Sequence, residues 1–309
     1  MILGVPVNAE TGYTKEYKSG LGVNNKGIEL ALSSEILKGK GLGWNADFNI
    51  ALNRNRLTAL PNNLQEITIG SQKLTVGKPI DQILVLQSQG VYQTDVDVPV
   101  NPANFQIMSY KGMALHGGDP KWKDQNGDYI IDENDKVAMG GYMPRIVGNF
   151  NSSLSYKGFN LDFNIFFALK RSIINQSAAN QLDFINKTGN NNINSVNEIT
   201  FWEKGINVND YPIYNPWSAV QSYRSDQDIF VENGSYLKLR SVSLGYDLSK
   251  LRYFNKGFKK VYVYASALNV LTVKSYTGGD PELVNYIGED TGYGLPLPRT
   301  FTLGLKLDL

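Results

Sequence analysis

Long runs of alternating apolar and polar residues constrain the fold of this chain more than any other feature. In residues 159–169 every second residue is Phe, Leu or Ile, while Asn160, Asp162 and Asn164 lie between them. Successive side chains of a β-strand point to opposite faces, so this period of two predicts a strand with one apolar and one polar face. A fold for this chain must therefore place a large apolar sheet surface against protein or against lipid.

The same alternation recurs in six further segments, around residues 28–32, 44–53, 149–156, 241–248, 262–268 and 301–309. In 262–268 it is less sharp, because Tyr262, Tyr264 and Leu268 alternate with small apolar residues. No segment has a convincing amphipathic-helix pattern. Several connections are too short for a parallel crossover. The sequence therefore predicts an all-β, antiparallel architecture.

The connections between these segments alternate between short and long. The links around residues 38–43 and 156–159 are short and the link around 250–259 is moderate, whereas long polar segments cover about 8–24, 54–141, 171–228 and 275–298. Short turns at one end and long loops at the other are typical of a transmembrane antiparallel β-barrel with long extracellular loops. A compact soluble domain rarely carries structureless loops of this length.

Composition excludes several other classes. The net charge of +1 gives no attraction to nucleic acid, and the absence of cysteine excludes disulfides and cysteine metal sites. No apolar run approaches the roughly 20 residues of a membrane-spanning helix. The N-terminal MILGVPVNAETG has no signal-peptide pattern, so we expect either an intracellular protein or a chain that starts within a longer precursor.

The apolar faces can be assigned in two ways. In the first, the Phe, Leu and Ile row of residues 159–169 faces lipid, and Asn160, Asp162 and Asn164 face a water-filled lumen. A wet lumen accounts for the many Asn, Asp and Ser residues, which are otherwise unfavourable in strands. In the second, the apolar side is the core of a soluble β-sandwich. The sorted loop lengths favour lipid.

Six segments occur in a fixed order along the chain. They are NNKGIELALSSEI, GGDPKWKDQNGDYIIDENDK, GNFNSSLSYKGFNLDFNIFF, ENGSYLKLRSVSLGYDL, VYVYASALNVLT with GGDPE, and LPLPRTFTLGLKL. Together they resemble the C-terminal barrel portion of the SusC/RagA-type TonB-dependent transporters of the Bacteroidota outer membrane. The resemblance covers nearly the whole chain.

This resemblance implies that residues 1–309 form the C-terminal strands of a 22-stranded β-barrel, with external loops at about 54–141, 171–228 and 275–298. The plug domain is absent from the chain. The implied function is non-enzymatic uptake of oligosaccharides or peptides, and the C-terminus would lie in the periplasm. Implied partners are a SusD-like surface lipoprotein, the remaining barrel and plug, and TonB acting through the missing N-terminal part. The alternatives are a soluble calcium-stabilised carbohydrate-binding β-sandwich and an independent small outer-membrane barrel.

One segment carries a metal-ligand pattern. In DQNGDYIIDEND the positions 1, 3, 5, 7, 9 and 12 are Asp124, Asn126, Asp128, Ile130, Asp132 and Asp135, with Ile130 offering its backbone carbonyl. This is the EF-hand spacing that gives Ca²⁺ its six to eight oxygens. Two residues depart from the pattern, because Tyr129 replaces the usual Gly and Asp135 the usual Glu. We predict bound Ca²⁺, or Mg²⁺ in its place; the alternative is an acidic turn without an ion.

Three tryptophans, Trp122, Trp202 and Trp217, lie in the long polar segments. Exposed aromatic rings can stack on a sugar or pack against a partner, which makes these residues candidates for substrate or partner contact. The alternative is that they pack the loops onto one another.

Overall fold

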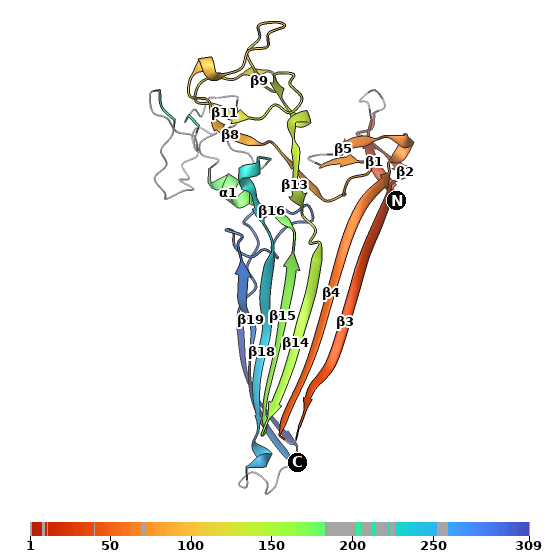
Figure 1. Cartoon of the computed structure of the whole chain (residues 1–309), viewed down its shortest axis with the longest axis vertical. Coiled ribbons are helices and arrows are strands. Elements are labelled where there is room, and N and C mark those ends of the chain that lie inside the picture. Colours follow the sequence, from red (N-terminus) through yellow and green to blue (C-terminus); the bar gives the residue numbers. More distant parts are fainter. Residues whose placement is uncertain are drawn as a thin grey trace.

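A seven-stranded antiparallel sheet forms the centre of the computed structural model (Figure 1). The structure describes residues 2–7, 10, 12–39, 41–69, 72–182, 202–204, 212–213, 220, 222, 226–251 and 259–308. In chain order the strands of this sheet are β3 (Gly22–Lys38), β4 (Leu42–Ala59), β14 (Ile146–Tyr156), β15 (Phe159–Leu169), β18 (Tyr236–Asp247), β19 (Lys260–Lys274) and β20 (Thr300–Asp308). Their spatial order is β20-β19-β18-β15-β14-β4-β3. The prediction of an antiparallel β architecture is confirmed.

The sheet is open. Its two edge strands, β20 and β3, pair only with β19 and β4 among the described residues. The described chain therefore forms a curved wall and no closed barrel.

The strand register places apolar residues in continuous rows on one face. One row runs from Phe48 through Phe150 and Ile165 to Leu239 and Leu271. Adjacent rows also approach each other: the centre of the Phe150 ring is 6.0 Å from that of Phe163, which lies in the next row. A one-residue slip would move every row to the other face, so the apolar pattern fixes the register.

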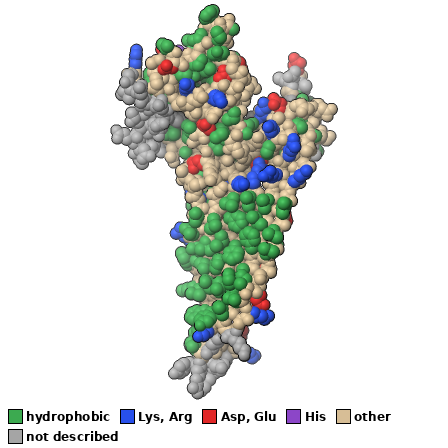
Figure 2. All heavy atoms as spheres, viewed as in Figure 1, with side chains coloured by type: hydrophobic (Ala, Val, Ile, Leu, Met, Phe, Trp, Pro, Cys, Tyr) green, Lys and Arg blue, Asp and Glu red, His purple; other side chains and the backbone are tan. Residues whose placement is uncertain are grey.

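This apolar face is uncovered, as the continuous band of hydrophobic side chains in Figure 2 shows. Ile28 is 72% exposed, Phe301 77% and Leu303 86%. A β-sandwich would bury such residues under a second sheet. The exposure of this face in the described structure therefore disagrees with the sandwich alternative.

The structure assigns the two faces of strand β19, which the sequence left less sharply divided. Val263, Ala265 and Ala267 lie in the apolar rows, opposite Leu305, Leu303 and Phe301 of β20. The larger Tyr262 and Tyr264 lie on the polar face, where Asn160 Nδ2 donates to the Tyr262 hydroxyl at 3.4 Å. A tyrosine ring can occupy a polar face when its hydroxyl finds a partner.

Short connections lie at one end of the sheet and long segments at the other, as predicted. At the end that holds the C-terminus, β3–β4 and β14–β15 are joined by short turns, and β18 continues into the 3₁₀ turn Leu248–Lys250 (Figure 1). In the β14–β15 turn Lys157 has φ 47° and Gly158 φ 97°. Two positive φ values define a type I′ hairpin turn, whose twist matches that of the strands.

The long segment between β4 and β14, predicted as an external loop, contains short strands. After β4 the chain forms β5 (Glu66–Ile69), β6 (Gln72–Thr75), β7 (Gln82–Val85), β8 (Ser88–Val91), β9 (Ser109–Tyr110), β10 (Met113–Ala114), β11 (Pro120–Trp122), β12 (Ile130–Ile131) and β13 (Val137–Gly141). These pieces enclose a hydrophobic cluster of Leu86, Tyr92, Val98, Met108, Tyr110, Leu115, Trp122, Ile131 and Val220. The largest buried cluster thus lies in the loops and not against the sheet.

The remaining described elements are short. They are β1 (Ile2–Pro6), β2 (Lys15–Ser19), β16 (Ser172–Ile174), β17 (Val231–Asn233) and the helix α1 (Gln176–Gln181). The sequence did not predict α1, because six residues are too few for an amphipathic pattern; the Asn175 side chain caps it by accepting from Ala178 N. None of the described helices has the length and apolarity needed to cross a membrane.

Gly148 tests how closely the apolar rows are packed. A Cβ at this position of β14 would meet the ring of Phe167 and lie 2.6 Å from the Asn49 carbonyl oxygen. We expect Gly148→Ala to destabilise the folded sheet by about 1–3 kcal/mol through overpacking, measured as a lower urea midpoint of the folded protein. The control Gly279→Ala, where a Cβ meets nothing within 4 Å, should leave the midpoint unchanged. Equal midpoints for both variants would contradict the packing.

Candidate functional site

The polar face of the sheet is a surface of amide, hydroxyl and carboxylate groups. One row crosses all seven strands and consists of Glu35, Asn45, Ser153, Asp162, Ser243, Ser266 and Thr302. Beside it, Asn164 Nδ2 donates to Asn149 Oδ1 at 2.7 Å and also to Asn151 Oδ1. Such a surface offers hydrogen-bond donors and acceptors to water or to a polar ligand along its whole width. The structure places Asn160, Asp162 and Asn164 on this face, opposite the apolar rows, as predicted.

A buried carboxylate attaches the first long segment to this polar face. Asp81 is fully buried and accepts from Asn55 Nδ2 at 2.8 Å and from Arg145 Nη2 at 3.0 Å. Asn55 in turn accepts from Ile80 N at 2.8 Å through its Oδ1. Because all the partners are satisfied, this network holds the residues around Asp81 against the ends of β4 and β14.

A second ionic cluster attaches the segment that follows β19, and we call it the Lys238 latch. Lys238 of β18 is only 2% exposed and donates to Asp280 Oδ2 at 3.0 Å and to Glu282 Oε2 at 2.6 Å. Glu282 also accepts from Arg240 Nη2 at 3.0 Å and from the Tyr236 hydroxyl at 2.9 Å. Burial raises the pKa of Glu282, but these hydrogen bonds and charges outweigh it and leave the pKa lowered.

Aromatic groups line the same part of the polar face. The Arg240 guanidinium lies 3.8 Å from the centre of the Phe166 ring, and that ring is 6.0 Å from the ring of Tyr236. A guanidinium over an aromatic face is held by a cation–π interaction. The latch therefore also orders two rings beside the polar row.

The structure brings together part of the predicted metal-binding loop. Asp124 accepts from Gly127 N and Tyr129 N at 2.7 and 2.9 Å, and Asp128 accepts from Ile130 N at 2.8 Å. Tyr129 has the positive φ of 66° that the EF-hand pattern requires at this position, and its side chain packs against the hydrophobic cluster of the loops. That packing explains how a tyrosine can replace glycine there.

The last residue of this loop is buried. Asp135 is 0% exposed and accepts from Gln125 N and Asp132 N, each at 2.8 Å. Burial raises the pKa of Asp135, and the nearby charges of Asp124 and Asp132 raise it further. Across the described residues, no three His, Cys, Asp or Glu side chains gather closely enough to hold a metal ion by themselves. An ion here would also need Asn126 and the Ile130 carbonyl.

The tryptophans pack inside the loops. Trp122 is 2% exposed and its ring centre is 4.8 Å from that of Tyr110, and Trp202 is also buried. This burial agrees with the alternative that the rings pack the loops onto one another. Trp217 lies outside the described residues.

The two-faced sheet, open at both edges and carrying folded loops at one end, matches part of a known barrel. The structure described as the RagAB peptide transporter has a TM-score of 0.72 and 22% identity to this chain, over 99% of this chain and 32% of that one. The RagAB peptide importer in its open-open state has a TM-score of 0.71 and 20% identity. These likenesses establish the fold.

Sequence comparison extends the likeness beyond the fold. TonB-dependent receptor P3 of Formosa agariphila is 28% identical over 324 residues, which cover 98% of this chain and 30% of the receptor. TonB-dependent receptor SusC of Bacteroides thetaiotaomicron is 23% identical over 99% of this chain and 28% of its own length. No protein-family model matches the chain.

The chain is thus homologous, over its whole length, to a portion of the SusC/RagA-type TonB-dependent receptors. It spans about 30% of the length of the curated relatives that it matches. Those relatives are receptors and not enzymes, and the homology implies a place in the bacterial outer membrane. The resemblance predicted from the six sequence segments is confirmed.

The Lys238 latch predicts how the segment after β19 is held. Lys238→Met leaves Asp280 without its cation and Glu282 with Arg240 alone, and should cost roughly 3 kcal/mol. We expect faster protease cleavage within residues 275–298, whereas Lys73→Met, which removes an exposed ion pair with Glu66, should have no effect. Because the pKa of Glu282 is lowered, the latch is intact above the ordinary pKa of a glutamate and is lost as pH falls through the lowered pKa of Glu282. Cleavage rates that are equal in both variants would contradict the latch.

Proposed function

We propose that this chain forms the C-terminal part of the barrel wall in a TonB-dependent outer-membrane importer of oligosaccharides or peptides. The observation that carries the proposal is the pair of opposed faces: a continuous, uncovered apolar face and a continuous polar row on the other side. In a bilayer, the apolar face contacts acyl chains and the polar row lines a wet interior. The same apolar face in water would be an aggregation hazard.

The open edges support a larger assembly. Among the described residues, β20 and β3 each present unpaired backbone groups along one side, and such groups are costly in lipid unless another strand pairs with them. We infer that they pair with further strands of a 22-stranded barrel that also holds a plug domain. TonB would act through the plug domain of that receptor, because the described residues of this chain contain only barrel wall and loops.

The two ends of the sheet differ in the length of their connections, and this difference indicates how the chain is oriented in the membrane. Long folded segments at one end suit the external side, and the short turns with the C-terminus suit the periplasm (Figure 1). A SusD-like surface lipoprotein would then dock on the external segments. The RagAB structures are described as a peptide importer, and this supports peptides as one substrate class beside oligosaccharides.

Spin labels at adjacent residues of β15 test the assignment of the two faces. The chain has no cysteine, so Phe163→Cys and Asp162→Cys can each be labelled singly in the assembled protein in a bilayer. We expect a label at position 163 to collide with oxygen more than with a water-soluble nickel complex, because oxygen concentrates in acyl chains. The label at position 162 is the matched control and should show the reverse preference.

The proposal fails if the label at position 163 is shielded from both reagents. That result would mean that protein covers the apolar face, as in a sandwich. A label at Ile50, in the neighbouring strand row, repeats the test on β4.

We further propose that residues 124–135 bind Ca²⁺ and so stiffen an external segment. The positive φ of Tyr129 and the carboxylate-to-backbone hydrogen bonds of Asp124 and Asp128 support an EF-hand type of loop. Burial raises the pKa of Asp135 and the charges of Asp124 and Asp132 add to this effect; a divalent cation would offset that added repulsion. The residues that would hold the ion are Asp124, Asn126, Asp128, Ile130, Asp132 and Asp135.

Calorimetric titration tests this metal site. We expect Ca²⁺ to bind with Kd on the order of 10⁻⁴ to 10⁻³ M, as in extracellular modules, and chelator to speed protease cleavage within residues 124–135. Asp128→Asn removes a ligand charge and should abolish binding. Glu133→Gln removes the same charge from a non-ligand position and should not. Identical titrations for these two variants would leave only the ion-free acidic turn.

A further inference from the structure

A basic pocket lies on the outer face directly beyond the apolar band. The register pairs Ile28 with Leu52 at the end of the band and then Lys26 with Arg54 one step further. Arg56 follows on β4 with the same parity, so its side chain shares the face of the apolar rows. Figure 2 shows Lys and Arg side chains gathered above the hydrophobic band, over the upper ends of β3 and β4.

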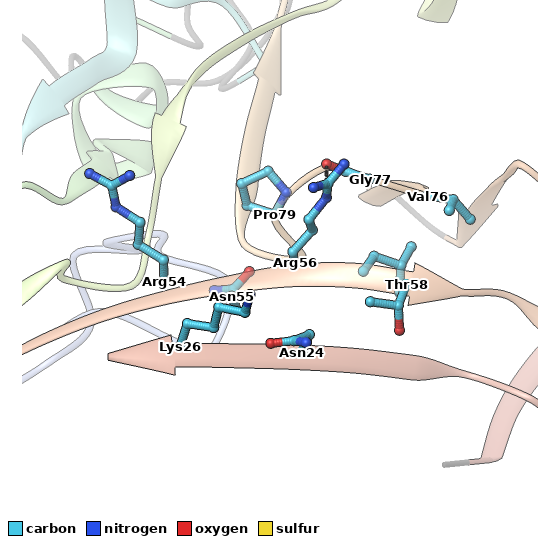
Figure 3. A pocket seen from close by; sticks show the side chains of 10 residues that line it. Asn24, Lys26, Arg54, Asn55, Arg56, Thr58, Val76, Gly77 and Pro79 are labelled. Carbon is cyan, nitrogen blue, oxygen red and sulfur yellow. Dashed lines mark hydrogen bonds between the residues drawn. The ribbon is translucent and has the colours of Figure 1, made fainter. Parts of the chain in front are cut away.

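The pocket has a volume of about 660 Å³ (Figure 3). Strands β3 and β4 form its floor, and the segment that includes Gly77 and Pro79 forms a rim beside β4. The side chains that supply polar groups come from alternate positions of the two strands, namely Asn24, Lys26, Arg54, Arg56 and Thr58.

The cations of this pocket have no carboxylate partner in the part of the chain that the structure describes. Lys26, Arg54 and Arg56 are all exposed, and none forms an ion pair there. The neighbouring Lys18 and Lys73, by contrast, pair with Glu16 and Glu66 at 3.1 and 3.0 Å. Arg56 Nε donates to the Gly77 carbonyl at 2.9 Å, which fixes the guanidinium at the lining of the pocket.

We propose that this pocket binds the phosphate group of a membrane-lipid headgroup in the outer leaflet. The inference rests on the proposed function, because it requires the apolar rows to lie in lipid. Guanidinium groups bind phosphate through paired, charge-assisted hydrogen bonds, and a lysine adds a point charge. A phosphate held here would place its acyl chains along Ile28, Leu30, Ile50 and Leu52, which continue the same face below the pocket.

The position of the pocket selects a lipid over a transported anion. The cations lie on the face opposite the polar row, so a substrate that moves along the polar face does not meet them. Basic residues near a membrane surface each contribute to the attraction of anionic lipids, and the contribution falls within a Debye length. Three cations that lack a carboxylate partner among the described residues line one pocket, so we expect the attraction to be localised there.

Lipid retention by the assembled barrel in detergent tests the proposal. The probes are phosphatidylglycerol, which is anionic, and phosphatidylcholine, which is zwitterionic, with bound lipid counted by native mass spectrometry. We expect preferential retention of phosphatidylglycerol, and a loss of affinity on the order of a hundredfold in the triple variant Lys26→Gln, Arg54→Gln, Arg56→Gln. The control Lys111→Gln, Lys121→Gln, Lys123→Gln removes the same charge from the distal loops and should retain lipid as the unmodified protein does.

Two results overturn the proposal, a single variant tests it if the triple variant does not fold, and one further result concerns the proposed function alone. Unchanged retention by the triple variant overturns it. Displacement of the lipid by millimolar inorganic phosphate, with equal binding of acyl-free glycerophosphoglycerol, would indicate a small-anion site and also overturn it. If the triple variant does not fold, Arg54→Gln alone should weaken retention about fivefold, and no change there counts against the site. A label at position 163 that reports no lipid contact removes the proposed function itself, which is a separate outcome from pocket variants that bind normally.

Discussion

The cross-strand register of the seven-stranded sheet is the constraint on which the rest of this molecule depends. Backbone pairing fixes which residues face each other, and the period of two then sends every apolar row to one side. A slip of one residue at β14–β15 would put Phe150 on the polar side and Asn151 among acyl chains. The tight turn at Lys157 and Gly158 sets this register locally, and the rows enforce it over the full strand length.

In the described chain, the main sheet and the main hydrophobic cluster are separate parts of the structure. Its sheet holds backbone hydrogen bonds and surface chemistry but buries little, whereas its main hydrophobic cluster lies in the segment between β4 and β14. If lipid covers the apolar face, as we propose, the sheet needs no core of its own. The loops must pack in water, and for this reason they contain Trp122, Tyr110 and Leu115 in a conventional buried cluster.

The strands, the faces of their side chains and the placement of short and long connections could be predicted from the sequence, because each of these leaves a local pattern. Contacts between distant segments could not be predicted. Lys238 and Glu282 are 44 residues apart, and nothing in either motif indicates that they meet. The burial of Trp122 was equally hidden, since its core forms from pieces between Leu86 and Val220. Tyr262 was assigned to no face because a ring with a hydroxyl suits either one.

The distribution of charge across the wall follows from the same two faces. At the upper end of β4, Asn55 points to the polar face and joins the buried Asp81–Arg145 pair, whereas Arg54 and Arg56 on either side of it point to the opposite face and have no carboxylate partner among the described residues. On the polar face, the carboxylates of Asp81, Asp280 and Glu282 are paired with cations. The outer side keeps its positive charge where a headgroup phosphate can neutralise it. Successive residues of a strand point to opposite faces, so β4 presents Asn55 to one face and Arg54 and Arg56 to the other.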